Sequence, residues 1–429
     1  MSKRTILPSW VKSSFFAESE RGGCILNFEQ SNLQWLIDNR SIVTYFQPIV
    51  SIKKQAIIGV EALSRGLANN GELIMPQDLF SKAVDYNKIV DLDRLCREVS
   101  LENYKKSRNQ DCFLFLNLDS SIIDRGVVGS GQLINVVTQL GLSPSSIVIE
   151  ITESQVYDIK ALVKFIKRYK AYGFLFALDD VGSDSSNLAR ILHVRPDIIK
   201  VDRELIKDIP SDYYKQELFK SLVTMAKKTG SLVIAEGVET HEEAVTSLEL
   251  GANFLQGYYI SKPIPSDISF SSGISKTVLS LATSYCSSIV EKIREDGLKK
   301  FTYNNILDNL AQELATSQPE DFESKLRGIA LKCPWVQCYY ILDKGGIQIT
   351  ETVDVHSNNN GKRHGMFQPA CRGTNQSQRD YYLFIHAGFE RYMSEPYISL
   401  ANGYQCITGA ALFKTNGCDS FILCIDFKV

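Results

Sequence analysis

The sequence predicts an α/β protein, a TIM-like (β/α)8 barrel followed by a smaller α+β domain. Between residues 42 and 260, eight apolar runs alternate with longer amphipathic stretches. The runs are nearly continuous in Ile, Val, Leu and Phe, which is typical of parallel strands buried on both faces. A doubly wound open sheet would give the same alternation, but no G-x-G-x-x-G motif follows an early strand. After residue 336 the pattern changes to antiparallel hairpins.

The barrel is predicted to occupy residues 29–268, after a polar and irregular extension at residues 1–28. Amphipathic helices are expected between its strands, for example over 157–171 and 213–228. The predicted strands are IVTYFQPIV at 42–50, AIIGVEAL at 56–63, CFLFLNL at 112–118, IVIEIT at 147–152, FLFALDD at 174–180, DIIKVD at 197–202, LVIAEGV at 232–238 and NFLQGYYI at 253–260.

Two further regions follow the barrel. Residues 269–318 are predicted to form a helical linker, with one helix over 276–296 and a second over 303–315. The first helix carries an apolar stripe that a second copy of the chain could cover. The stripe consists of Val278, Leu281, Ala282, Tyr285, Ile289 and Ile293. Residues 319–429 are predicted to be an α+β domain, with a helix to about residue 332, a hairpin in VQCYYILDKGGIQITETV, and the strands YQCITGAALF and SFILCIDFKV.

The composition predicts a soluble protein of the cytoplasm. The net charge of -2 gives no general attraction to a nucleic-acid polymer or to a membrane surface. The ten cysteines show no C-x-x-C pair, which suits a reducing compartment. No apolar segment approaches the ~20 residues that a membrane-spanning helix needs.

Polar side chains follow seven of the eight predicted strands, at the point where each strand ends. In a (β/α)8 barrel these ends meet at one rim, where active sites are built. One such residue alone is more often structural, but the set indicates a site. Carboxylate and amide oxygens without His or Cys suit Mg²⁺ or Mn²⁺, and paired ions are the usual arrangement for attack on a phosphodiester. The residues are Glu61, Asn117, Glu150, Asp179 with Asp180, Lys200, Glu236 and Gln256.

The motifs around these residues resemble those of the EAL-domain family of cyclic-di-GMP phosphodiesterases, over about residues 30–268. They are EAL at 61–63, EITE at 150–153, DDVG at 179–182, IKVD at 199–202, IAEGVET at 234–240 and QGYYISKP at 256–263. The resemblance implies a barrel with one reversed strand. It also implies a bacterial enzyme that uses two Mg²⁺ or Mn²⁺ ions to hydrolyse cyclic di-GMP to linear pGpG.

The resemblance also implies roles for individual residues. Lys200 would orient or deprotonate the attacking water, and Glu61 and Glu236 would share in catalysis. The metal ligands would be Glu61, Asn117, Glu150, Asp179, Asp180 and Glu236. Gln47, Arg65 and Gln256 would contact the substrate, and Glu153 with Ser183 would brace the loop after Asp180.

That loop departs from the family pattern. The family usually reads close to DDFGTGYSSL, whereas this chain reads DDVGSDSSNL at 179–188. Asp184 stands where the family has glycine, and aspartate tolerates a positive φ less well than glycine does. Two alternatives to an active phosphodiesterase therefore stay open: a catalytically weak cyclic-di-GMP receptor that signals through dimerisation, and a scaffold that uses the barrel only to dimerise.

Residues 319–429 resemble PAS-like sensor domains of the Cache type, with lower specificity than the barrel motifs. The resemblance implies a small ligand, such as an amino acid, near Arg379, Tyr381, Tyr382 and Asp426. It also implies that this domain regulates the barrel within a homodimer. The alternative is a packed core without a cavity that serves only for dimerisation.

Overall fold

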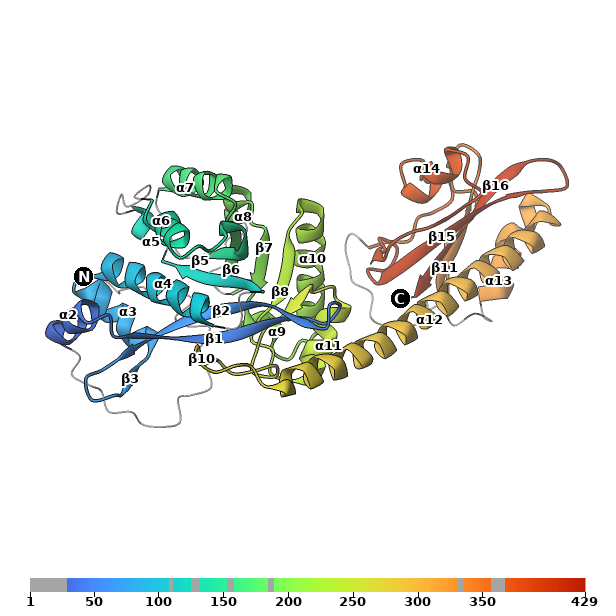
Figure 1. The fold of residues 1–429 in the computed structure, drawn as a ribbon. Helices are drawn as coiled ribbons and strands as arrows, with labels where there is room; N and C mark the ends of the chain where they lie inside the picture. Colours follow the sequence, from blue (N-terminus) through green and yellow to red (C-terminus); the bar gives the residue numbers. More distant parts are fainter. Residues whose placement is uncertain are drawn as a thin grey trace. The chain divides into compact units, whose positions relative to one another are not determined.

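The computed structural model describes residues 29–107, 111–119, 121–124, 131–152, 158–183, 189–330, 333, 335–355 and 367–428. The chain divides into two compact units, Met1–Ile289 and Val290–Val429. Figure 1 shows the helices of the first unit surrounding its strands. None of the described helices is long and apolar enough to cross a bilayer.

The first unit is a closed barrel of eight strands, and one of them is reversed. β1 pairs in antiparallel fashion with both β2 and β9, and the remaining neighbours are parallel. Closure through β1 confirms the predicted barrel and excludes the open sheet. The eight strands are β1 (Ile42–Ser51), β2 (Ala56–Leu67), β4 (Phe113–Leu118), β5 (Ile147–Thr152), β6 (Leu175–Val181), β7 (Ile198–Val201), β8 (Leu232–Ala235) and β9 (Phe254–Leu255).

The reversal of β1 follows from its connection to β2. Residues 52–55 join the two strands by a tight turn in which Gln55 has φ 51°. A connection this short permits only antiparallel pairing, because a parallel crossover needs a dozen residues or more. The register places Gln47 directly opposite Glu61.

The elements outside the barrel wall agree with the sequence pattern. The predicted helices over 157–171 and 213–228 correspond to α7 and α10, each within two residues at either end. The elements are α2 (Gln30–Asp38), β3 (Leu73–Ile74), α3 (Pro76–Asp85), α4 (Ile89–Lys106), α5 (Ser121–Asp124), α6 (Gln132–Gln139), η1 (Pro144–Ser146), α7 (Ile159–Ala171), α8 (Ala189–Val194), α9 (Arg203–Ile206), α10 (Tyr213–Thr229), α11 (His241–Glu249) and β10 (Ile264–Pro265).

An apolar layer fills the barrel interior and sets the position of the polar rim. The layer consists of Ile49, Phe115, Val148, Ala177, Ile198 and Ile234. Successive side chains of a strand point to opposite faces, so the residue two positions on points into the same interior. Five of these positions lead to Asn117, Glu150, Asp179, Lys200 and Glu236, and on the reversed β1 the step back leads to Gln47. On β2 the matching position is Gly59, where a Cβ would lie 2.5 Å from the Phe115 ring.

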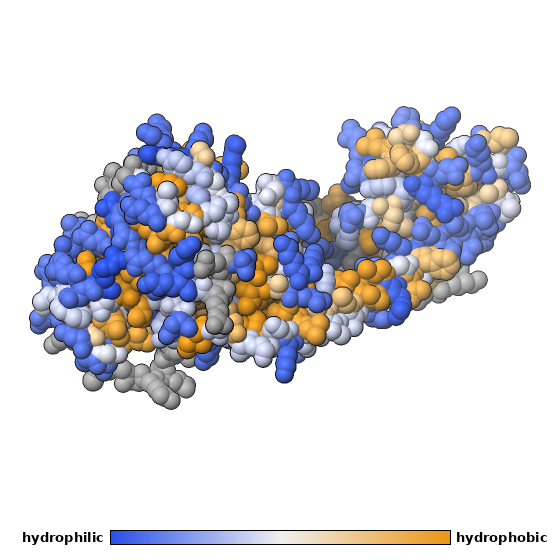
Figure 2. Space-filling model, in the orientation of Figure 1, coloured by the Kyte–Doolittle hydropathy of each residue, from blue (hydrophilic) through white to orange (hydrophobic). Residues whose placement is uncertain are grey.

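A single helix, α12 (Ser272–Ala315), replaces the two predicted linker helices. The prediction of a break was wrong because the intervening residues continue the helix through Gly297. Val278, Leu281 and Ala282 are buried in the barrel's outer core, so this part of the predicted stripe is covered within the chain. The stretch 290–302 is exposed throughout, and Figure 2 shows apolar side chains at the surface along α12.

The second unit contains a six-stranded antiparallel sheet, which confirms the α+β prediction. The strand order is β12-β11-β16-β15-β13, with β14 paired to β15. One face of the sheet packs on α12 and α13, and the other packs on α14. The elements are η2 (Pro319–Asp321), α13 (Phe322–Ala330), β11 (Val336–Leu342), β12 (Val353–Asp354), α14 (Asp380–His386), β13 (Arg391–Met393), β14 (Tyr397–Ile398), β15 (Gln405–Lys414) and β16 (Ser420–Lys428).

Candidate metal-dependent active site

Lys200 lies at the centre of the barrel rim and is fully enclosed by acidic side chains. Its Nζ lies 2.6 Å from Glu150 Oε1 and 2.6 Å from Glu236 Oε1. Asp179 Oδ1 is 3.1 Å away and Glu61 Oε2 is 3.5 Å away. The lysine side chain is 1% exposed, so these ion pairs are shielded from water. The structure therefore brings five of the predicted site residues into one buried cluster.

Glu61 connects this cluster to the ends of β4 and β9 through two amide side chains. Asn117 donates a hydrogen bond from Nδ2 to Glu61 Oε1 at 2.9 Å, and Gln256 donates from Nε2 to Glu61 Oε2 at 2.6 Å. The Gln256 amide also lies 3.3 Å from Gln47 Oε1, and the Gln47 amide donates to the carbonyl of Ser261 at 3.2 Å. Asn117 and Gln256 thus lie at strand ends, as predicted, and Gln47 reaches the same group from the middle of the reversed β1.

Burial and charge move the pKa values of the cluster in different directions. Burial alone would lower the pKa of Lys200, but the surrounding carboxylates, Asp179 foremost, raise it well above its usual value. Burial raises the pKa values of Glu150 and Glu236 well above the ordinary range. Burial would also raise the pKa of Glu61, yet Lys200 and the hydrogen bonds from the two amides lower it. One lysine therefore does not neutralise the acids that surround it.

An irregularity in β6 allows the side chains of two consecutive aspartates to point toward the same rim. In a regular strand, Asp179 and Asp180 would point to opposite faces. The pairing of β6 with β7 is irregular between Leu178 and Val181, and Asp180 has φ 57°. A bulge of this kind redirects a side chain, and the positive φ of Asp180 marks the residue at which this strand is redirected. One oxygen from each of Asp179, Asp180 and Glu236 lies within 4.8 Å of the others.

The donor set fits a divalent cation. The buried amide oxygens Asn117 Oδ1 and Gln256 Oε1 accept no hydrogen bond from any residue that the structure describes. A buried acceptor of this kind costs free energy unless it finds a partner. Carboxylate and amide oxygens are the ligands of hard cations such as Mg²⁺, Mn²⁺ or Ca²⁺. A bound cation would satisfy the Asn117 oxygen and relieve the repulsion among the carboxylates, which leaves the Gln256 oxygen for a substrate.

Arg65 lies four residues beyond Glu61 in the chain, and Ser183 lies three residues beyond Asp180. Arg65 is on the same face of β2 as Glu61, and its guanidinium lies over the Tyr45 ring at 5.4 Å from the centroid. It also donates to the carbonyl of Ser64 at 3.1 Å. Ser183 donates its backbone N–H to the Asp180 carbonyl at 3.3 Å. Glu153, the predicted brace for this loop, lies outside the described residues.

Comparison with known proteins identifies the family of the barrel. The family model described as "EAL domain" matches residues 30–263. The chain belongs to the EAL-domain family. Its EAL domain is 27% identical over 226 residues to the uncharacterized EAL-domain containing protein YkuI of Bacillus subtilis, covering 52% of this chain and 55% of that protein.

A second relative is the bifunctional diguanylate cyclase/cyclic di-GMP phosphodiesterase MucR of Pseudomonas aeruginosa. It is 28% identical over 243 residues, covering 55% of this chain and 35% of MucR. The chain therefore spans about half or less of the curated relatives that it matches. A crystal structure of YkuI, in complex with c-di-GMP and calcium, matches 94% of this chain and 99% of that chain, with a TM-score of 0.76 and 22% identity. This likeness extends the shared fold beyond the EAL domain.

The polar residues predicted in the C-terminal unit form two groups. Asp426, which is 3% exposed, accepts hydrogen bonds from Thr408 Oγ1 at 2.6 Å, Cys338 Sγ at 3.2 Å and Ser399 Oγ at 3.3 Å. Burial raises the pKa of Asp426. Among the described residues, no Lys, Arg or His side chain lies within 4.0 Å of its carboxylate.

The second group lies around Gln376. Arg379 Nε donates to Gln376 Oε1 at 3.3 Å, and the Tyr381 hydroxyl donates to the same oxygen at 3.4 Å. Tyr382 instead donates its hydroxyl to the Lys344 carbonyl at 3.1 Å. Gln376 is 7% exposed and was not predicted, because an isolated glutamine in a polar loop gives no signal in the sequence.

Proposed function

We propose that the chain hydrolyses cyclic di-GMP to linear pGpG at the rim of the EAL domain. The observation that carries this proposal is the buried cluster around Lys200 together with Asp179, Asp180 and Glu236 on one rim. The phosphodiesterase name of MucR supports the choice of substrate. We expect the enzyme to be specific for cyclic di-GMP and to use two Mg²⁺ or Mn²⁺ ions as cofactors. We expect it to act in the cytoplasm.

In this proposal the chain's own residues bind the substrate, orient the attacking water and transfer a proton. Hydrolysis joins the oxygen of water to one phosphorus and breaks the P–O3′ bond, and the proton lost by the water ends on the released 3′ hydroxyl. The Lys200 ammonium orients the water, and one of the carboxylates of Glu61 and Glu236 takes its proton and returns it to the departing O3′. Arg65 binds a phosphate, for which a planar guanidinium is well shaped. When bound, two divalent cations supply Lewis acidity toward the phosphate and the water.

The acidic side chains and the Asn117 amide would also bind the cations. One cation would be held by Glu61, Asn117, Glu150 and Asp179, and a second by Asp180, with Glu236 completing the set. Gln47 and Gln256 would contact the nucleotide next to Glu61. Glu153 and Ser183 would brace the loop that follows Asp180.

Turnover of cyclic di-GMP tests the proposal. Wild-type protein with Mg²⁺ or Mn²⁺ is expected to release pGpG, and a chelator should stop it. Asp180→Asn should reduce turnover to background because it weakens a metal ligand. Asp197→Asn is the matched control, since Asp197 accepts the Phe176 N–H at 2.8 Å near the opposite end of the strands. Binding without turnover in the wild type would favour the receptor, and neither binding nor turnover would favour the scaffold.

We also propose that α12 mediates a homodimer. Val290, Ile293 and Phe301 are 53%, 66% and 65% exposed and recur at helical spacing along one face. An exposed apolar stripe of this kind marks an interaction surface. Ile293→Glu should convert a dimer to a monomer in light scattering after gel filtration. Lys299→Glu is the control, because Lys299 is exposed and, six residues after Ile293, lies on the opposite face of the helix. A monomeric wild type would contradict the proposal.

We propose, as a second function, that the C-terminal unit is a PAS/Cache-like sensor that regulates hydrolysis. The groups that support it are the Asp426 carboxylate, which could receive an amine in place of its present donors, and Arg379 with Tyr381, which could receive a carboxylate in place of Gln376. Amino acids and organic acids should be screened for a shift in melting temperature and a change in the rate. Arg379→Ala should remove both effects, whereas Arg372→Ala, which loses only a surface pair with Glu323, should keep them. A screen without any shift would leave the packed core as the better description.

A further inference from the structure

A buried carboxylate on α4 contacts the chain where β4 leaves the barrel. Asp93 is 3% exposed, and its Oδ1 accepts the backbone N–H of Asp119 at 3.2 Å. Its Oδ2 lies 2.6 Å from Nη2 of Arg97, one helical turn further along α4. Asp93 thus joins a helix outside the barrel to the backbone of a strand end.

The backbone contact at Asp119 lies close in the chain to Asn117, a residue of the site. Asp119 follows Asn117 by two residues, and β4 ends between them at Leu118. Asn117 donates to Glu61 at 2.9 Å, and its Oδ1 accepts no hydrogen bond within the part of the chain that the structure describes. A continuous series of contacts therefore runs from Arg97 through Asp93 and the β4 exit to Asn117.

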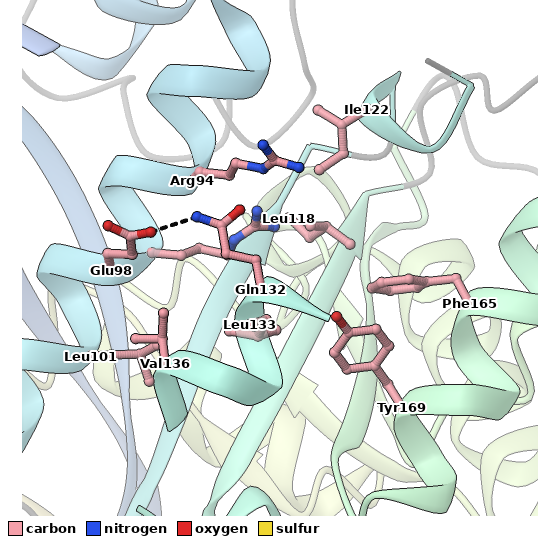
Figure 3. A pocket seen from close by; sticks show the side chains of 11 residues that line it. Arg94, Glu98, Leu101, Leu118, Ile122, Gln132, Leu133, Val136, Phe165 and Tyr169 are labelled. Atoms are coloured by element: carbon pink, nitrogen blue, oxygen red, sulfur yellow. Dashed lines mark hydrogen bonds between the residues drawn. The ribbon is translucent and has the colours of Figure 1, made fainter. Parts of the chain in front are cut away.

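Two small cavities flank the Asp93–Arg97 pair. One, of about 20 Å³, is lined by Asp93, Arg97 and Asn117 among others. The other, of about 40 Å³, is also lined by Arg97, and Figure 3 shows Arg94, Gln132 and Tyr169 around it. Spaces of this size hold a few water molecules at most. The arrangement suits support of the β4 exit rather than binding of a metabolite.

The pair is poorly explained as a source of stability alone. Desolvation of two charges offsets most of their attraction, so a buried ion pair adds little to the stability of a fold. At the opposite end of the barrel, Asp197 makes a similar pair of contacts, one with a basic side chain and one with a backbone N–H. Asp197 pairs with Lys170 at 2.9 Å and accepts the N–H of Phe176, but it is 35% exposed and remote from the rim.

We propose that Asp93 and Arg97 are positioning residues for metal binding. They fix the β4 exit so that the Asn117 oxygen faces the rim together with Glu61. This role rests on the function proposed above, because Asn117, whose position the pair fixes, is one of the metal ligands proposed there. Groups that orient metal ligands through hydrogen bonds typically contribute about 10- to 100-fold to metal affinity.

Titration of the full chain with Mn²⁺ in the absence of nucleotide tests this proposal. Asp93→Ala should raise the Kd for Mn²⁺ about tenfold. Asp93→Asn should restore most of the affinity, because its amide oxygen can still accept the Asp119 N–H. Asp197→Ala should lower the melting temperature without changing the Kd. If Asp93→Ala does not fold, Arg97→Met and Asp93→Asn are compared with the wild type, and Arg97→Met is expected to bind Mn²⁺ more weakly because the Asp93 carboxylate loses the cation that holds it.

The results distinguish this proposal from the phosphodiesterase proposal. An unchanged Kd in the Asp93 and Arg97 variants, or an equal loss in Asp197→Ala, would overturn the positioning role. A raised Kd in Asp93→Ala with recovery in Asp93→Asn supports it, even if no variant and no wild-type sample hydrolyses cyclic di-GMP. That last outcome would overturn the proposed activity alone.

Discussion

The two units of the chain bury carboxylates in opposite ways. In the EAL domain, Glu61, Glu150, Asp179 and Glu236 surround the buried ammonium of Lys200. In the C-terminal unit, Asp426 is surrounded by neutral donors from Thr408, Ser399 and Cys338. The first arrangement concentrates charge beyond what one lysine neutralises and therefore favours a further cation. The second buries a single carboxylate, whose pKa is raised by burial although the three hydrogen bonds act in the opposite direction.

Removal of Lys200 should have the largest effect. Lys200→Ala leaves several buried carboxylates without a counter-charge, and loss of one partner of a buried pair typically costs about 3–5 kcal/mol. We expect a loss of this order in the free energy of unfolding without metal, measured by urea denaturation. Saturating Mn²⁺ should return part of it, because the cation replaces positive charge. Equal stability of variant and wild type in a chelator would show that the acids are largely protonated there.

Changes at Asp426 should have an intermediate effect. Asp426→Ala leaves the Thr408, Ser399 and Cys338 donors without their shared acceptor, and an unsatisfied buried polar group costs about 1–3 kcal/mol. Asp426→Asn keeps one acceptor oxygen and should cost less. Both can be measured by urea denaturation, with the Kd for Mn²⁺ as a control that should not change. A loss as large as that of Lys200→Ala would remove the contrast between the two units.

The pH dependence of Asp426 should give the smallest effect. Its folded pKa is raised above 3.8, so the folded state binds a proton more readily than the unfolded state. Its contribution to stability is therefore fully present below 3.8 and is lost as the pH rises through the folded pKa. The free energy of unfolding of the wild type, relative to Asp426→Asn, should increase as the pH falls toward 4. A difference that does not change with pH would contradict the raised pKa.

The sequence predicted the barrel well because its signals are local. Buried parallel strands are continuous apolar runs, and a polar residue at a strand end reports a rim position directly. Glu150 and Lys200 could therefore be assigned to the rim from strand pattern alone. The break predicted within α12 was wrong, since helix boundaries depend on tertiary packing as well as on local preference.

Contacts between residues that are far apart in the sequence could not be predicted from local pattern. That Lys200 contacts four acids at once depends on strands far apart in the chain. The contact between Asp93 and the Asp119 backbone depends on how α4 lies against β4. In the sequence, Asp93 is one acidic residue among several on an amphipathic helix. The grouping of Arg379 with Gln376 is likewise a matter of loop packing.

The apolar layer beneath the rim has an electrical consequence. Phe115, Val148 and Ile198 are among the side chains that close the barrel below the carboxylates, and water is excluded there. Low-dielectric walls direct the field of enclosed charges toward the open side. The negative potential of the acids is thus projected outward from the mouth of the barrel, where it raises the local concentration of divalent cations. Added salt would shorten the range of that field and slow the capture of the metal.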